Sequence, residues 1–428
     1  MYFYRHKGLK WVVNFLKHLH KGEHLKRVVV TGLGIVSSIG NDTSAVLSSL
    51  KNHTSGIVFS EKLKELNLRS QVIGDINIDI SQYLTKKQLR FLSPVASLCA
   101  IAMSQAVANS GLSEAQISNQ NTGLIVGSGS ASNDNVIDAY ETLKTKGAKK
   151  IDPFKILKTM SSTASANLTS LFKIKGLSYS ISAACATSSH CIGNAFEQIQ
   201  RDKQSIMFAG GGDEVHWSSA VLFDAMRALV STNNPKDSSM PFAKDRNGFV
   251  LSGGAGIIVL ENLEHAQQRG ANILAELVAY GTSSDGGDIV KPNTEGAILA
   301  MQKAIHQAKD CGVDAINYIN AHAASTKVGD TSEIQAIQSV FGHAIPSISS
   351  TKSLTGHPIG ASGAHELIYS ILMMQHNFAF GNHDYELGDE FKDTPILKHN
   401  QDMLISTMMS NSFGFGGTNA SLIIKKYG

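Results

Sequence analysis

The sequence predicts an α/β protein in which buried strands alternate with helices. Short apolar runs recur along the chain, and each is followed by a helical pattern or by a polar loop. The runs occupy residues 122–126, 206–209, 256–260, 274–280, 316–321 and 404–408. The 38 glycines among 428 residues are typical of a fold with many tight turns. With 42% hydrophobic residues, the chain can bury a large core, as about three domains or as one duplicated unit.

Composition and charge narrow the class of protein. The net charge of +3 is too small to predict nucleic-acid binding, and no apolar run reaches the roughly 18 residues of a membrane helix. The cysteines show no C-x-x-C spacing and no dense framework, so neither a metal site nor a disulfide scaffold is predicted. They are Cys99, Cys185, Cys191 and Cys311. We therefore expect a cytoplasmic protein in a reducing compartment.

Three segments are predicted. Residues 1–24 are basic, histidine-rich and aromatic. We interpret them as an extension, either an organellar transit peptide or the product of a start site placed too far upstream. The composition changes near residues 264–270, so we expect one half that carries the nucleophile at 25–268 and a second half that carries two histidines at 269–428.

The first strand is expected at residues 26–31, and Gly32 and Gly34 follow it. Two glycines at this spacing open the turn that binds dinucleotides in some α/β folds. Ser37 stands where the third glycine of that turn would allow close helix packing. Nicotinamide or flavin binding is therefore not favoured.

Cys185 is the first candidate for chemistry. Apolar residues alternate before it, as in a strand, and recur at helical spacing after it. A thiol in the first turn of a helix faces unpaired N–H groups and the positive end of the helix dipole, so we expect a lowered pKa and a reactive thiolate. The alternative is an unreactive cysteine that packs as a small buried hydrophobe.

Two histidines and a lysine follow strands of the second half. His322 stands at the carboxyl end of the run 316–321, and Lys352 and His357 lie in a glycine-containing loop after another short run. Open α/β sheets bind ligands at the carboxyl ends of their strands. Two imidazoles can stabilise developing negative charge or move protons at neutral pH. The alternative for each histidine is a structural role.

Residues 409–419 form the last candidate segment. Its three glycines within four positions allow a tight turn and a close approach of the backbone to a substrate. A backbone N–H group in this segment could join that of Cys185 in an oxyanion hole. Phe413 and Phe415 stand beside the glycines, and large apolar side chains there could gate an acyl channel. A plain hairpin loop is the alternative.

In combination, these segments resemble the β-ketoacyl-acyl-carrier-protein synthases, the condensing enzymes of fatty-acid elongation. The resemblance covers residues 26–426 and rests on the nucleophile segment, two histidine motifs and the terminal loop, at residues 184–188, 321–330, 351–357 and 411–419. Residues 210–217 and 185–191 are most similar to the synthase I branch. The resemblance implies a thiolase-like fold, with two similar halves in five α-β-α-β-α layers.

The family also implies a mechanism. Cys185 would accept an acyl chain from the phosphopantetheine arm of acyl carrier protein, so that no cofactor is bound by the chain itself. Malonyl carrier protein would then lose carbon dioxide, while His322 and His357 donate hydrogen bonds to the enolate oxygen. The resulting carbanion would attack the stored thioester and give a β-ketoacyl thioester. Lys352 would act electrostatically, held by Glu333.

Further residues take supporting roles in this resemblance. The N–H groups of Cys185 and Phe415 would hold the oxyanion. Residues 330–333 also fit a helix start that is capped by Asp330, with Glu333 as the acid three residues later. The substrate would contact Thr326, Phe413, Phe415 and Ser130.

Two positions depart from the family pattern. Ala324 lacks a hydroxyl group that would contact the phosphopantetheine arm, so we expect weaker binding of that arm without loss of chemistry. Asn247 replaces a commonly acidic residue, which leaves the ion-pair partner at that position undefined.

The expected partners are acyl and malonyl thioesters on acyl carrier protein, together with a second copy of the chain in a homodimer. Carrier proteins are acidic, and basic residues cluster where the family docks its carrier. These residues are Lys86, Lys87, Arg90, Lys149 and Lys150. Solvated surface is the alternative for such a cluster.

Three other functions remain open from the sequence. A biosynthetic thiolase has the same fold and also uses a cysteine, but the pair of histidines with Lys352 favours decarboxylative condensation. A non-catalytic chain-length partner subunit would lack Cys185. A cysteine hydrolase would need one histidine and would leave the terminal glycine loop unexplained.

Overall fold

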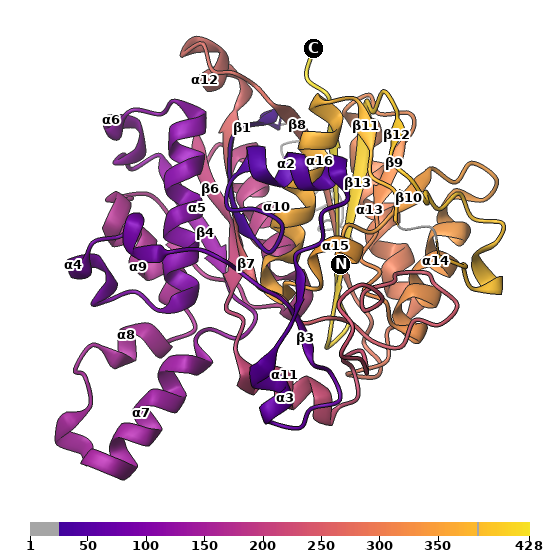
Figure 1. Ribbon diagram of the computed structural model, residues 1–428. Coiled ribbons are helices and arrows are strands. Elements are labelled where there is room, and N and C mark those ends of the chain that lie inside the picture. Colours follow the sequence, from indigo (N-terminus) through magenta and orange to yellow (C-terminus); the bar gives the residue numbers. More distant parts are fainter. Residues whose placement is uncertain (1–24, 383–384) are drawn as a thin grey trace, which may run out of the picture.

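One ten-stranded mixed sheet connects the two halves of the molecule, in the order β10-β9-β13-β14-β8-β1-β7-β6-β4-β5 (Figure 1). The computed structural model describes residues 25–382 and 385–428, so the predicted extension at 1–24 lies outside the described residues. The first half contributes β1 (Val28–Ser37), β4 (Thr122–Gly127), β5 (Ser178–Tyr179), β6 (Ile206–Asp213) and β7 (Gly254–Asn262). The second contributes β8 (Ala275–Ser284), β9 (Tyr318–Asn320), β10 (Ser347–Ser349), β13 (Thr407–Gly414) and β14 (Thr418–Lys425).

The two halves share one strand topology. In the first half, β1 pairs with β7 and β7 with β6 in antiparallel fashion, and β6-β4-β5 continue in parallel. In the second half, β8-β14-β13 pair antiparallel and β13-β9-β10 continue in parallel. A short antiparallel pairing of β1 with β8 joins the halves, from Val28 opposite Leu277 to Val30 opposite Ala275. The prediction of two similar halves is confirmed.

Helices cover both sheet regions and fill the space between them. In the first half, α5 (Pro94–Ser110) and α9 (Thr163–Phe172) lie on the outer face, and in the second half α13 (Thr294–Asp310) and α14 (Lys327–Phe341) do so. Between the halves, α10 (Thr187–Gln200) contacts α16 (Ser362–Gln375), and each packs on strands of both halves (Figure 1). The layers therefore alternate α-β-α-β-α, as the resemblance implies.

Shorter elements complete the described chain. The helices are α2 (Thr43–Asn52), α3 (Glu61–Glu65), α4 (Lys86–Leu89), α6 (Glu114–Ile117), α7 (Asn133–Lys146), α8 (Lys155–Thr159), α11 (Trp217–Ala225), α12 (Leu263–Gln268) and α15 (Lys352–Thr355). Two small sheets pair β2 (Ile57–Phe59) with β3 (Val72–Gly74) and β11 (Phe378–Ala379) with β12 (Gln401–Asp402). No helix in the described parts of the chain is long and apolar enough to cross a membrane.

The glycine pair near the start of the chain lies inside β1, which continues to Ser37 and does not end at residue 31 as predicted. A Cβ atom on Gly32 would lie 2.5 Å from the carbonyl oxygen of Ala106, and one on Gly34 would lie 1.8 Å from that of Ala102. Both glycines therefore allow α5 to pack directly on the strand. This contact leaves no dinucleotide-binding turn at these residues.

Candidate active site

Cys185 lies in a 3-10 turn, η3 (Ala184–Ala186), that leads directly into α10. Ala184 before it adopts a left-handed conformation with φ of 46°, which turns the chain sharply. The hydroxyl group of Thr187 secures the turn, since it accepts from the N–H of Ala183 and donates to the carbonyl of Ala184, each at 2.8 Å. The thiol therefore stands at the start of a helix, between the two halves.

The expected lowering of the Cys185 pKa is wrong. Burial raises the pKa of this thiol to about 12, although the charge of Lys352 and the backbone N–H groups of Phe415 and Cys185 act in the opposite direction. The side chain is only 8% exposed, and the sequence pattern gave no measure of this burial. The resting side chain is a thiol that must give up its proton as it reacts.

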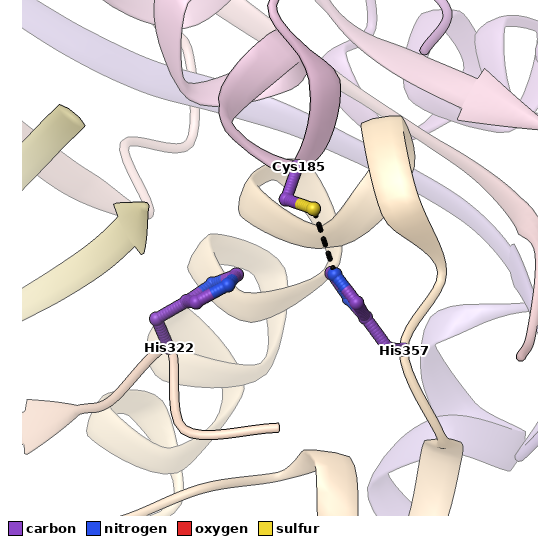
Figure 2. Close-up of side chains that lie close together, drawn as sticks. All are labelled: Cys185, His322 and His357. Carbon is purple, nitrogen blue, oxygen red and sulfur yellow. Dashed lines mark hydrogen bonds between the residues drawn. The ribbon is translucent and has the colours of Figure 1, made fainter. Parts of the chain in front are cut away.

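His357 is the nearest proton carrier to that thiol. Its Nε2 atom lies 3.0 Å from the Sγ atom of Cys185, and the ring points at the sulfur in Figure 2. Its Nδ1 atom lies 2.9 Å from the Oγ atom of Ser362, at the start of α16. A hydroxyl group can donate or accept, so Ser362 can support either neutral tautomer of the ring.

His322 follows β9 and, like His357, belongs to the second half of the chain. Its ring is nearly perpendicular to that of His357, with 5.3 Å between the centroids (Figure 2). Burial, followed by the charge of Lys352, holds the pKa of both imidazoles well below the usual value, so both rings are neutral near pH 7. Neutral rings can donate N–H groups to an enolate oxygen without an imidazolium charge.

Lys352 forms a buried ion pair with Glu366 of α16, and the predicted pairing with Glu333 is wrong. Both side chains of the pair are at most 2% exposed. Burial raises the pKa of Glu366 to about 7, against the effect of Lys352. Sequence reasoning missed Glu366 because this residue lies outside the predicted motifs. An acidic residue within the apolar run of α16 was the available signal.

Glu333 holds the backbone on which His322 stands. Its carboxylate oxygens accept from the N–H groups of His322 at 2.9 Å and Ala323 at 2.8 Å, and one of them also accepts from the side chain of Asn411 at 3.1 Å. Burial raises the pKa of Glu333 to about 7, and these hydrogen bonds oppose that effect. Glu333 is therefore a positioning residue for the histidine and for the terminal strand β13.

Asp330 does not cap the following helix as predicted. The N-cap of α14 is Thr326, whose hydroxyl group accepts from the N–H of Gly329 at 3.2 Å. Asp330 is one turn further on and fully buried, and it accepts from the N–H groups of Phe242, Ala324 and Thr326. The sequence assigned the cap to the wrong residue because an acid and a threonine are both good N-caps.

The terminal segment is both a hairpin and part of the site. Strands β13 and β14 enclose a turn in which Gly416 and Gly417 have φ of 83° and 70°, a region that favours glycine. The turn presents the N–H of Phe415 to the sulfur of Cys185, beside the N–H of Cys185 itself. Two N–H groups that converge on one point can hold an oxyanion. The two interpretations of this segment are therefore compatible.

A cavity of about 840 Å³ opens above the thiol and is mainly apolar. Its lining includes Cys185, His322, His357, Thr326, Phe413 and Phe415, together with the two departures Ala324 and Asn247. Ser130 is absent from this lining, and its hydroxyl group donates to Asp213 at 3.0 Å. The cavity brings together Cys185, His322 and His357, whereas Lys352 and Ser130 lie outside its lining.

The predicted docking residues lie on the surface of the first half. Lys86 and Lys87 belong to α4, and Arg90 is the C-cap residue of this helix. The guanidinium group of Arg90 lies 4.6 Å from the ring centre of Phe154. Lys149 and Lys150 end a 3-10 turn after α7, and all five side chains are exposed. The positive charges are therefore available to a partner.

Comparisons with known proteins agree with this geometry. Residues 25–266 match the family profile "Beta-ketoacyl synthase, N-terminal domain", and residues 274–386 match "Beta-ketoacyl synthase, C-terminal domain". The chain is 47% identical over 408 residues to the 3-oxoacyl-[acyl-carrier-protein] synthase 1 of Escherichia coli K12. The aligned residues cover 94% of this chain and 99% of that protein. Identity to a Vibrio harveyi synthase 2 is 34%, over 94% and 99% of the two chains.

Solved structures show the same similarity. A β-ketoacyl synthase from Burkholderia phymatum superposes with a TM-score of 0.88 at 32% identity, over 94% of this chain and all of that one. A ketosynthase in complex with its type II acyl-carrier protein superposes with a TM-score of 0.84 at 26% identity, over the same shares.

Proposed function

The chain belongs to the β-ketoacyl synthase family, and we propose that it elongates fatty acids by decarboxylative condensation on Cys185. The observation that carries this proposal is the convergence of a thiol, two neutral imidazoles and two N–H groups in one cavity. The substrates are an acyl thioester and a malonyl thioester on acyl carrier protein, whose phosphopantetheine arm supplies the thiol. The greater identity to synthase 1 than to synthase 2 favours the synthase I branch.

The first half-reaction loads the acyl chain. The Cys185 thiol gives its proton to Nε2 of His357 as the sulfur attacks the acyl thioester carbonyl, and the two N–H groups hold the oxyanion. Collapse of the intermediate expels the carrier thiolate, which takes the proton from His357. The acyl group then remains on Cys185 as a thioester, and His357 is neutral again.

The second half-reaction forms the new carbon–carbon bond. The malonyl C–COO⁻ bond breaks and carbon dioxide leaves. The electron pair of that bond stays with the remaining thioester as an enolate, whose oxygen accepts hydrogen bonds from the N–H groups of His322 and His357. The enolate carbon attacks the acyl-Cys185 carbonyl. The backbone N–H groups of Cys185 and Phe415 hold the oxyanion, and collapse releases β-ketoacyl carrier protein together with the Cys185 thiolate, which takes a proton from water. Lys352 supplies a buried positive charge to both anionic steps.

Malonyl-dependent release of carbon dioxide, measured with and without an acyl primer, tests this function. A synthase releases one carbon dioxide for each β-ketoacyl product when the primer is present. A thiolase-type transferase releases none, and a non-catalytic subunit does not become acylated. Release without any condensation in the unmodified protein would show a decarboxylase and would contradict the proposal.

Carrier-protein docking is proposed on the basic surface formed by Lys86, Lys87, Arg90, Lys149 and Lys150. What supports it is the exposure of the five charges and the acidic character of carrier proteins. A related ketosynthase is known in complex with its acyl-carrier protein. We also propose a cytoplasmic location, which is supported by four cysteines that are all free.

A homodimer is proposed through the edge strand β5 and the helix α7. Both residues of β5 are exposed at the end of the sheet, so a second copy could extend the sheet there. Helix α7 projects from the body of the molecule in Figure 1. One face of it carries an apolar stripe of Val136, Tyr140 and Leu143, each about half exposed.

Sedimentation of the full chain tests this contact. The Tyr140→Glu variant should shift the protein from dimer to monomer, because it places a charge in the apolar stripe. The Leu404→Glu variant alters a side chain that is 70% exposed in the second half and should stay dimeric. An unmodified chain that sediments as a monomer would contradict the proposal.

A further inference from the structure

The catalytic trio has the composition and spacing of a metal site. The Sγ atom of Cys185 and one ring nitrogen from each of His322 and His357 all lie within 4.8 Å of one another. All three side chains line the same open cavity, so an ion can reach them from solvent. Their spacing in the sequence gave no sign of this arrangement, because each ligand comes from a different segment.

We propose that Cys185, His322 and His357 bind a soft divalent cation, with Zn²⁺ as the expected ion, and that this binding reversibly inhibits the protein. One thiolate and two imidazoles are ligands that Zn²⁺ prefers, whereas Mg²⁺ and Ca²⁺ prefer oxygen. Three protein ligands leave the fourth tetrahedral position for a water molecule from the cavity. Coordination displaces the thiol proton to solvent, so the bound sulfur can no longer accept an acyl group.

The distances require only small movements. Zn–S and Zn–N bonds of about 2.3 and 2.0 Å place the sulfur and a ring nitrogen roughly 3.5 Å apart in a tetrahedral site. The Cys185 sulfur and the Nε2 atom of His357 are already 3.0 Å apart, and the third ligand atom lies within 4.8 Å of both. Side-chain adjustments on the order of 1 Å therefore suffice.

The surroundings of the trio also suit a cation. The hydroxyl group of Ser362 contacts Nδ1 of His357 at 2.9 Å, which fixes the ring as a metal ligand through Nε2. The positive charge of Lys352 is paired with Glu366. Glu333 adds a second carboxylate that holds the backbone of His322. The carboxyl groups of Glu366 and Glu333 therefore oppose the positive charge of Lys352 beside the trio.

Titration of the full chain with CoCl₂ tests the site directly, because Co²⁺ replaces Zn²⁺ and its thiolate complexes absorb in the near ultraviolet. The expected result is one Co²⁺ per chain, a thiolate-to-cobalt band, and loss of that band when ZnCl₂ is added. Alkylation of Cys185 with iodoacetamide before the titration should abolish the band. That test needs no substitution, so misfolding cannot explain its outcome.

Variants then assign the ligands. His322→Gln and His357→Gln should each weaken Co²⁺ binding by about tenfold or more. Cys311→Ser removes a partly buried thiol outside the site and should leave the band unchanged. A band that survives alkylation of Cys185 would overturn the proposal. So would a band that disappears in the His18→Gln/His20→Gln variant, because these two histidines of residues 1–24 are not among the proposed ligands. Inhibition of condensation by ZnCl₂ and recovery with a chelator would then give the functional consequence.

Discussion

The Nε2 atom of His357 lies 3.0 Å from the Sγ atom of Cys185, across the interface between the two halves of the fold. Cys185 belongs to the first half and His357 to the second, so the reactive pair exists only when the halves are packed together. The central helices α10 and α16 set this distance, because Cys185 precedes α10 and His357 precedes α16. Any change that shifts these helices should affect loading before it affects stability.

The pH dependence of alkylation tests the resting state of Cys185. Burial raises the pKa of the thiol to about 12, and only the thiolate reacts. The rate constant with iodoacetamide should therefore rise about tenfold per pH unit from pH 6 to 9 without a plateau. Mass spectrometry of the modified chain gives this rate, and the Cys185→Ala variant gives the background from other cysteines. A plateau near pH 7 would show a thiolate of lowered pKa.

The Lys352–Glu366 pair predicts a specific stability effect. The Lys352→Met variant leaves Glu366 buried without its partner, which should cost about 3–5 kcal/mol in the free energy of unfolding. A carboxyl group with a raised pKa stabilises the fold when protonated, and this contribution is lost as pH rises through the folded pKa. The loss in the variant should therefore be larger at pH 8 than at pH 5.5, as measured by urea unfolding.

The double variant Lys352→Met/Glu366→Gln is the control for this effect. It removes both charges and should recover most of the stability at pH 8, while condensation stays low because the buried positive charge is gone. A double variant as unstable as Lys352→Met alone would mean that the pair acts through packing and not through charge.

Ser362 is predicted to position His357 and to assist its change of tautomer. Loading needs a bare Nε2 atom that accepts a proton, whereas decarboxylation needs an Nε2–H group that donates. The Ser362 hydroxyl group can pair with Nδ1 in both states. Ser362→Ala should therefore lower kcat by about tenfold with little change in KM. Ser362→Thr keeps the hydroxyl group and should retain most activity, whereas equal loss in both variants would indicate a packing role.

Charge reversal tests the basic docking surface. Lys87→Glu should raise the KM for carrier-bound substrate several-fold, and high salt should reduce the difference from the unmodified chain. Alkylation of Cys185 by iodoacetamide should proceed at the normal rate. Arg90→Glu is a less clean variant, because it also removes the contact with the Phe154 ring. Loss of both activity and alkylation in Lys87→Glu would indicate misfolding.

The sequence predicted the layout of the fold because its signals were local. Apolar periodicity located the main strands, although their ends shifted where glycines allowed close packing, as in β1. The alternation of strand and polar loop also placed Cys185, His322 and His357 at the ends of strands or the starts of helices. These positions follow from backbone regularities that a short segment carries by itself.

The details that failed depend on contacts between distant segments. The partner of Lys352 could not be predicted, because Glu366 and Glu333 are both acidic and only packing decides between them. The pKa of Cys185 was mispredicted because the helix start is visible in the sequence but the degree of burial is not. Ser362 was missed because its role depends on a single hydroxyl group 2.9 Å from His357.

The most direct test follows the mass of the intact chain through one catalytic cycle. Incubation with acyl carrier protein that bears an acyl chain should add the mass of one acyl group, located on Cys185 by peptide mapping. Malonyl carrier protein should then remove this mass while one carbon dioxide is released per acyl group lost. If carbon dioxide were released while the acyl group stayed on Cys185, or if no acyl group were found there, the proposed condensation on this thiol would be wrong.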